Sequence, residues 1–203
     1  MSRDPCRPSS RRGARGAAVM SGPLRAGILL LALAGCGRAS APPVGTTATP
    51  TAFRTLSVPA AGVRLRVPAD WTVTPGQPPL MDVISSGSSI IALWRYSTRV
   101  PPPRTGAGVS AALTTLERRA RRRDRTFRVQ RAGTGRLQGA PVIILDATET
   151  ISGRLRRVRS EHVLLRGSEL VLEAYSPPAA FPHEDHLVFS PVRKSLSLDS
   201  PEG

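Results

Sequence analysis

Nine consecutive apolar or small residues, 26–34, lie near the start of the chain and separate a short leader from everything that can fold. A membrane-spanning helix needs about 20 such residues, so this run is too short to cross a bilayer. Its length matches the apolar core of an export signal, and Arg25 supplies the positive flank that stays in the cytoplasm. The run therefore predicts an exported chain whose fold is built from the residues beyond the signal.

The residues that end this signal indicate its type. They are Leu33, Ala34, Gly35 and Cys36, and a Leu, two small residues and a Cys resemble the lipobox of bacterial lipoproteins. The resemblance implies cleavage before Cys36, a diacylglyceryl group on its thiol and a further acyl chain such as palmitate on its freed amine. Two or more chains anchor a protein stably, at about 0.8 kcal/mol per buried methylene. The alternative is an ordinary secretory signal followed by a chance cysteine.

Cleavage at this point defines residues 1–35 as a signal peptide and leaves the mature chain without a thiol. Residues 1–19 are long for the segment before an apolar core, so Met20 is an alternative translation start. Cys6 is removed and Cys36 carries lipid. We therefore expect no disulfide, no cysteine nucleophile and no thiolate metal site, and no cofactor beyond the covalent lipid.

The mature chain remains strongly basic. Removing residues 1–35 leaves 23 basic and 13 acidic residues, a formal charge of +10. Such a surface favours anionic lipid headgroups, envelope polymers or acidic proteins. Only one basic residue is a lysine, Lys194, which equally fits a genome that encodes arginine by default. Nucleic acid is an unsuitable partner for an exported protein.

The composition changes again at residue 53. Residues 36–52 hold the lipidated cysteine and a Pro-, Thr- and Ala-rich stretch with no aromatic side chain, which predicts a flexible tether. All eight aromatic residues lie from Phe53 onward. We therefore expect a globular domain over 53–198 and a short tail over 199–203.

Apolar and polar residues then alternate with the period of two that is typical of half-buried strands. Val63, Leu65 and Val67 alternate with arginines, and a turn after them places Trp71 in the core. Further strands are predicted over 81–85, 90–96, 127–132, 136–138, 142–151, 155–165 and 169–175. Turns are expected at 86–88, 133–135, 152–153 and 167–168, short enough for antiparallel hairpins.

Two segments have helical spacing instead. In 109–125, Val109, Ala112, Leu113, Leu116 and Ala120 form one apolar stripe. A shorter helix carries Phe189, Val192 and Leu196 and begins at Ser190-Pro191. Period and turn lengths together predict an α+β fold with a mainly antiparallel sheet.

This order of elements resembles the PsbP-like domain, including the LpqN-type lipoproteins of actinobacteria. The resemblance rests on the opening Val63-Arg-Leu-Arg-Val-Pro-Ala-Asp-Trp71, the single mid-chain helix, the long hairpins and the closing Leu172-Glu-Ala-Tyr-Ser-Pro177 before a helix. It covers roughly residues 56–198. It implies an α/β/α sandwich around an antiparallel sheet, and an accessory binding or assembly protein without catalytic residues.

One short cluster contains residue types that bind metals. His183 and His186 could share a helix face, with Glu184 or Asp185 as a further ligand. The competing interpretation is a solvated helix start, where acidic residues favour the positive end of the dipole. The remaining histidine, His162, lies within a predicted strand and would have to converge from elsewhere.

The mid-chain helix also carries a row of arginines. Arg118, Arg121, Arg122 and Arg125 point away from the apolar stripe, with Arg119 on its flank. They are candidates for binding anionic lipid or envelope polymer. The competing interpretation is a solvated face whose last arginines suit the negative helix end.

Catalytic motifs are missing from the sequence. It contains no Gly-x-Ser-x-Gly elbow, no phosphate-binding glycine loop and no His-Glu-x-x-His helix. Asp146 and Glu149 fall near a strand end, where carboxylates commonly pair with local arginines. The sequence therefore predicts a membrane-anchored, extracytoplasmic, non-catalytic binding or accessory domain for a protein or anionic envelope partner. The alternatives are a metal-binding protein using His183 and His186, and a carrier of lipid or another small molecule.

Overall fold

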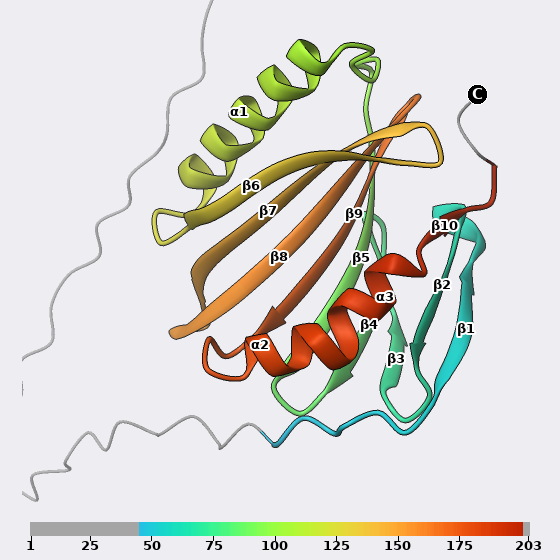
Figure 1. The fold of residues 1–203 in the computed structure, drawn as a ribbon, viewed down its shortest axis with the longest axis vertical. Coiled ribbons are helices and arrows are strands. Elements are labelled where there is room, and N and C mark those ends of the chain that lie inside the picture. Colours follow the sequence, from blue (N-terminus) through green and yellow to red (C-terminus); the bar gives the residue numbers. More distant parts are fainter. Residues whose placement is uncertain (1–44, 201–203) are drawn as a thin grey trace, which may run out of the picture. The chain divides into compact units, whose positions relative to one another are not determined.

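The computed structural model describes residues 45–200; the predicted signal peptide, the lipobox with Cys36 and the first part of the tether lie outside them. The described residues form two antiparallel sheets (Figure 1), ordered β3-β4-β5-β9-β8-β7-β6 and β1-β2-β10. The strands are β1 Phe53–Val58, β2 Val63–Pro68, β3 Thr72–Pro75, β4 Leu80–Ser86, β5 Ser89–Ser97, β6 Arg128–Leu137, β7 Ala140–Ile151, β8 Arg154–Leu165, β9 Ser168–Ser176 and β10 Ser197–Leu198. The helical segments are η1 Pro59–Ala61, α1 Gly106–Arg123, α2 Phe181–Glu184, η2 Asp185–Phe189 and α3 Ser190–Lys194.

Strands form at all the positions predicted from period-two patterning, whereas β1, β3 and β10 were not predicted. In β2, Val63, Leu65 and Val67 are at most 1% exposed, while Arg64 and Arg66 are exposed. The same alternation continues through the long hairpins. Ser152 and Gly153 both have positive φ, 50° and 75°, the backbone of a two-residue hairpin whose twist matches its strands. The turns predicted at 86–88 and 152–153 are confirmed, and the one predicted at 167–168 lies one residue earlier, at Arg166 and Gly167, because Ser168 already pairs with Leu165.

One predicted turn is wrong. Gly133 and Gly135 do not reverse the chain but lie inside β6, paired with Ile144 and Val142 of β7. The reversal occurs at Gln138 and Gly139, which have φ values of 46° and 88°. Glycines in an exposed strand mimic a turn signal, whereas the true turn requires two consecutive residues with positive φ.

Helices cover both faces of the large sheet (Figure 1). Helix α1 packs through Val109 against one face, on Ile143, Leu145 and Ala147 of β7. The segment from α2 to α3 packs on the opposite face, where Phe181, Phe189 and Val192 join the main core. The α/β/α arrangement implied by the PsbP-like resemblance is therefore present. Trp71 is 2% exposed and has an edge-to-face contact with Phe189 at 6.5 Å.

The last helical segment begins earlier than predicted. It starts at Phe181, not at Ser190-Pro191, and continues through the π-helical turn η2 into α3. Pro191 has no N–H for the α-helical ladder, and its ring crowds the carbonyl one turn before it. A wider turn just ahead of Pro191 accommodates both effects and leaves the helix unbroken.

Residues 45–52 belong to the predicted tether, and they form no helix or strand. They do contact the domain: Ala48 N–H donates to Ser86 Oγ at 2.9 Å, and its carbonyl accepts from Trp71 Nε1 at 3.2 Å. Thr47 Oγ1 lies 2.8 Å from Ser89 Oγ, and Ser89 in turn donates to the buried Glu184. Ordered contacts thus begin before Phe53.

Candidate functional site

Helix α1 covers only part of its sheet face, and a groove lies beside it. The helix packs mainly on β6 and β7, and residues of β5, β8 and β9 line a hollow together with it. Two adjoining hollows, about 370 and 310 Å³, share Leu116, Arg119 and Glu169 as walls. Ligand sites commonly have volumes in this range. A hollow of equal volume lies between residues 45–50 and His183. The groove is the candidate site because the buried polar side chains of Ser160 and His162 line it.

A chain of hydrogen bonds crosses the polar floor of the groove. His162 Nδ1 lies 2.7 Å from Glu169 Oε1, and His162 Nε2 lies 3.1 Å from Ser160 Oγ. Ser160 and His162 share one face of β8 because they are two residues apart, and Glu169 is diagonal to His162 across the β8–β9 hairpin. Both ring nitrogens are engaged, so the imidazole is held in one orientation.

Ser160, His162 and Glu169 are connected like the nucleophile, base and orienting carboxylate of a catalytic triad. The position of Ser160 within a central strand, however, limits its use as a nucleophile. Ser160 pairs with Leu145 on one side and Glu173 on the other, so its backbone N–H belongs to the sheet ladder. A serine nucleophile needs free donors aimed at the oxyanion that forms beside it. The backbone of the central strand supplies no such free donor at Ser160.

A second acidic group extends the floor. Tyr175 O–H donates to Glu173, two residues away on the same face of β9. Burial raises the pKa of Tyr175, and the nearby Glu173 carboxylate raises it further. Burial also raises the pKa of Glu149, with repulsion from Glu173 as the next cause. The floor is thus a buried acidic region that favours positive charge above it.

Two arginines of α1 form the opposite wall. Arg119 and Arg123 line the larger hollow, one helical turn apart, together with Leu116 and Ala120. Arg123 acts electrostatically on the floor, since it lowers the pKa of Glu149 against the larger effect of burial. Within residues 45–200, neither guanidinium has a carboxylate within 4 Å. Cations and carboxylates therefore face each other without closing into ion pairs.

The other end of the groove is apolar. Its walls are Val100, Pro101, Pro102, Pro103, Ala111, Ala112, Leu164 and Leu165. Ser168 also lines this end, and its buried hydroxyl has no hydrogen-bond partner among the described residues. Thr105 caps α1 by accepting from Gly108 N–H at 3.1 Å, which fixes the helix start beside the proline loop. The groove as a whole is amphiphilic, with one charged end and one apolar end.

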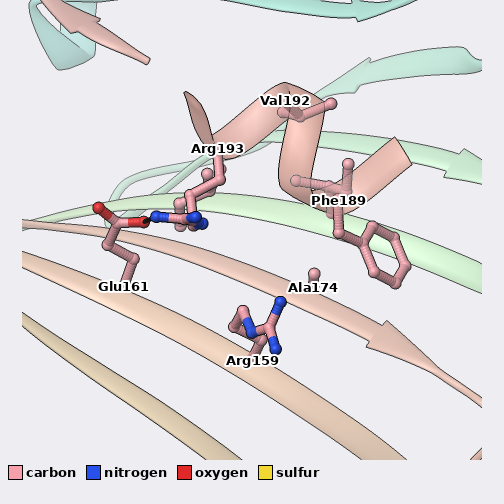
Figure 2. Close-up of a pocket in the computed structure, with 8 residues that line it drawn as sticks. Arg159, Glu161, Ala174, Phe189, Val192 and Arg193 are labelled. Atoms are coloured by element: carbon pink, nitrogen blue, oxygen red, sulfur yellow. Dashed lines mark ion pairs between the residues drawn. The ribbon is translucent and has the colours of Figure 1, made fainter. Parts of the chain in front are cut away.

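The opposite face of the sheet carries a structural ion-pair network (Figure 2). Arg159 donates from Nε to Asp146 at 2.7 Å and pairs with Asp185 of η2. Arg193 of α3 lies 3.7 Å from Glu161, whose pKa burial raises. The cavity between these side chains and Phe189 is about 10 Å³, room for about one water molecule. This network joins the helical segment to the sheet. A separate, more open hollow of about 280 Å³ lies beside it, lined by Arg131, Asp146, Arg159 and Arg193 among others.

The arginines predicted to bind an anionic partner lie on the outer side of this region. Arg118, Arg121 and Arg122 are exposed on α1, and Arg121 pairs with Glu117 at 3.3 Å. Arg125 is not helical, because α1 ends at Arg123 and a turn follows. None of the four lines the groove. Arg119 and Arg123 do; helical spacing had placed Arg119 on the flank of the apolar stripe but gave no such signal for Arg123.

The histidines predicted to bind metal are both exposed, and the carboxylates between them are engaged elsewhere. Glu184 is buried and accepts from Ser89, and Asp185 pairs with Arg159. Within residues 45–200, no three His, Cys, Asp or Glu side chains converge as a metal site. The structure therefore does not bring a third ligand to His183 and His186.

Sequence reasoning missed Ser160, Glu169, Glu173 and Tyr96 as groove residues. A signal was present for the first two. Ser160-x-His162 places two polar side chains on one strand face, and the tight turn at Gly167 brings Glu169 back beside them. Polar side chains on the buried face of a central strand are unusual and indicate a site or a network.

Comparison with solved structures identifies the fold. The cyanobacterial PsbP (CyanoP) from Synechocystis sp. PCC 6803 has a TM-score of 0.57 and 12% sequence identity, covering 78% of this chain and 97% of that one. LpqN of Mycobacterium tuberculosis, a protein involved in cell envelope biogenesis, has a TM-score of 0.49 and 16% identity, covering 72% and 90%. No family model and no curated protein matches the chain. The domain thus has a PsbP-like fold.

None of the helices in residues 45–200 has the length and apolar character needed to cross a bilayer.

Proposed function

We propose that this chain is an extracytoplasmic lipoprotein, held in the envelope by lipid on Cys36, whose non-catalytic domain binds a small amphiphilic molecule in the groove beside α1. The observation that carries the proposal is the groove itself, with charged residues at one end and the proline loop at the other. It favours the carrier alternative among those that the sequence left open. The tether places such a domain close to the membrane.

The anchor has a direct test. Replacing Cys36 by alanine removes the thiol that accepts the diacylglyceryl group, so the variant is expected to stay unprocessed or to leave the membrane fraction. Fractionation of cells with metabolic palmitate labelling measures both results. A Cys36→Ser variant serves as a second thiol-free control. A Cys36→Ala protein that still incorporates palmitate would contradict the anchor.

The groove is tested by filling it. Ala111 is exposed and lines the apolar end, so Ala111→Trp occupies that space without entering the core. We expect the chain from residue 37 onward to bind at least one single-chain, 12-carbon amphiphile with 1:1 stoichiometry. Ala111→Trp is expected to weaken that binding at least tenfold. Titration calorimetry below the critical micelle concentration measures the affinity. The amphiphiles compared carry phosphoethanolamine, phosphocholine, phosphoglycerol or maltoside as the head group.

A neighbouring position provides the matched control. Ser110 is exposed on α1 and lines neither hollow, so Ser110→Trp adds the same side chain one residue away. Its affinity is expected to equal that of the unmodified chain. Binding of none of the amphiphiles, or equal weakening by both tryptophans, would exclude the groove as their site.

A second candidate function remains from the outward arginines. Arg118, Arg122 and Arg125 are exposed and have no carboxylate partner among the described residues, and such a surface attracts anionic membranes or polymers. This surface is distinct from the groove. Binding there would fall steeply with added salt, because exposed charges are screened within about 10 Å at 0.1 M.

A further inference from the structure

The charges of the groove are arranged in two opposed rows. On the helix side, Arg119 and Arg123 follow one another along α1. On the sheet side, Glu169 and Glu173 lie two and six residues beyond the hairpin glycine Gly167 and point to the same face of β9. Charges of both signs therefore line one hollow of about 370 Å³.

Neither row is neutralised by the other. Glu169 uses Oε1 for His162, and Glu173 uses Oε2 for Tyr175, which leaves one oxygen of each carboxylate to accept a further bond. Arg119 and Arg123 make no hydrogen bond or ion pair to a carboxylate within residues 45–200. Arg119 and Arg123 are exposed, and Glu169 and Glu173 are half-buried. Two opposed rows of charge along one hollow are electrostatically complementary to a ligand that carries both signs itself.

We propose that the groove selects amphiphiles whose head carries a phosphate and a primary ammonium, that is, aminophospholipids of the phosphoethanolamine type. The proposal rests on the proposed function and deepens it. The phosphate would lie against Arg119 and Arg123, whose planar guanidinium groups match phosphate oxygens. The ammonium would lie over Glu169 and Glu173, beside the ring of Tyr96, and the acyl chain would follow the proline loop.

The chemistry of the floor excludes close analogues. A primary ammonium has three N–H donors for the two free carboxylate oxygens, whereas a quaternary ammonium has none. A head with phosphate but no cation leaves the floor unpaired and places a further negative charge near Glu149 and Glu173, which already repel each other. The same reasoning disfavours an uncharged sugar head, which leaves both rows unpaired.

The test compares lauroyl lysophosphatidylethanolamine with the phosphocholine and phosphoglycerol heads on the same chain. The chain from residue 37 onward is expected to bind the first at least tenfold more tightly than either of the others. Glu173→Gln keeps the side-chain size and is expected to remove the preference for ethanolamine over glycerol. Arg119→Gln with Arg123→Gln is expected to weaken all three phosphate heads about tenfold and to leave dodecyl maltoside unchanged.

The helix itself supplies a matched control. Arg118→Gln with Arg122→Gln makes the same change of charge on the outer side of α1, and it is expected to leave all affinities unaltered. Equal affinity for the three phosphate heads would overturn the selectivity while leaving amphiphile binding intact. The selectivity would also be overturned if Arg118→Gln with Arg122→Gln weakened binding as much as Arg119→Gln with Arg123→Gln. Chainless phosphoethanolamine binding as tightly as the lysolipid would instead contradict the proposed function, since the acyl chain would then contribute nothing. Failure of every amphiphile, including the maltoside, would instead remove the proposed function.

Discussion

Phe181→Ala is expected to lower the free energy of unfolding by about 3–5 kcal/mol. Phe181 is 1% exposed, its ring centre is 5.5 Å from that of Phe189, and the guanidinium of Arg157 lies 4.8 Å above it. Truncation removes the buried ring and leaves a cavity between α2 and the sheet that rigid neighbours fill only in part. Urea unfolding followed by tryptophan fluorescence measures the loss.

A second phenylalanine separates burial from ring contacts. Phe53 has an arginine over its ring as well, Arg66 at 5.9 Å, but it lies on β1 at the edge of the small sheet and is only partly buried. Phe53→Ala is therefore expected to cost less than half as much as Phe181→Ala. Equal losses for the two variants would contradict the central role given to Phe181 in joining the last helical segment to the core.

Much of the fold follows from local patterns. Alternation in β2 and in the long hairpins fixes which side chains enter the core, and the two-residue turns at 152–153 and 166–167 fix the pairing. The patterns mislead where one residue type serves two purposes. The glycines inside β6 led to the prediction of a turn. Pro191 led to the prediction of a helix start, because the π-helical turn that accommodates it has no sequence signal.

The groove was harder to predict than the fold. Its walls come from α1, β5, β8 and β9, and only the sheet order brings them together. Arg119 and Arg123 differ from their neighbours only in which side of the helix they occupy relative to the open strands. That side depends on α1 packing over β6 and β7, which helical spacing alone does not determine.

By contrast, the expected pairing of Asp146 with a local arginine is confirmed, because Arg159 lies opposite it in the register.

Arg159→Met is expected to lower the free energy of unfolding by about 3–5 kcal/mol, because it removes one partner of a buried network. The guanidinium bonds Asp146 through two nitrogens, at 2.7 and 3.3 Å, and pairs with Asp185 through the third. Asp146 is 7% exposed, so its charge is poorly solvated when the arginine is gone. Methionine retains most of the packing beside Phe181, so the loss reports the charge. The comparison is Arg64→Met, whose pair with Asp199 at 2.9 Å is open to solvent, and which is expected to cost at most about 1 kcal/mol.

The double variant Arg159→Met with Asp146→Asn distinguishes a lost attraction from a stranded charge. If the single variant is unstable because Asp146 is left charged and buried, neutralising that side chain should restore part of the stability. The double variant is then expected to be more stable than Arg159→Met alone, and the two effects should be non-additive by about 1–3 kcal/mol, as for groups in one network. Urea unfolding of the unmodified protein, Arg159→Met, Asp146→Asn and the double variant measures the coupling free energy. Additive losses would show that Arg159 acts mainly through Asp185 and the packing against Phe181. The link between helix and sheet would then depend on η2, since Asp185 lies in that π-helical turn.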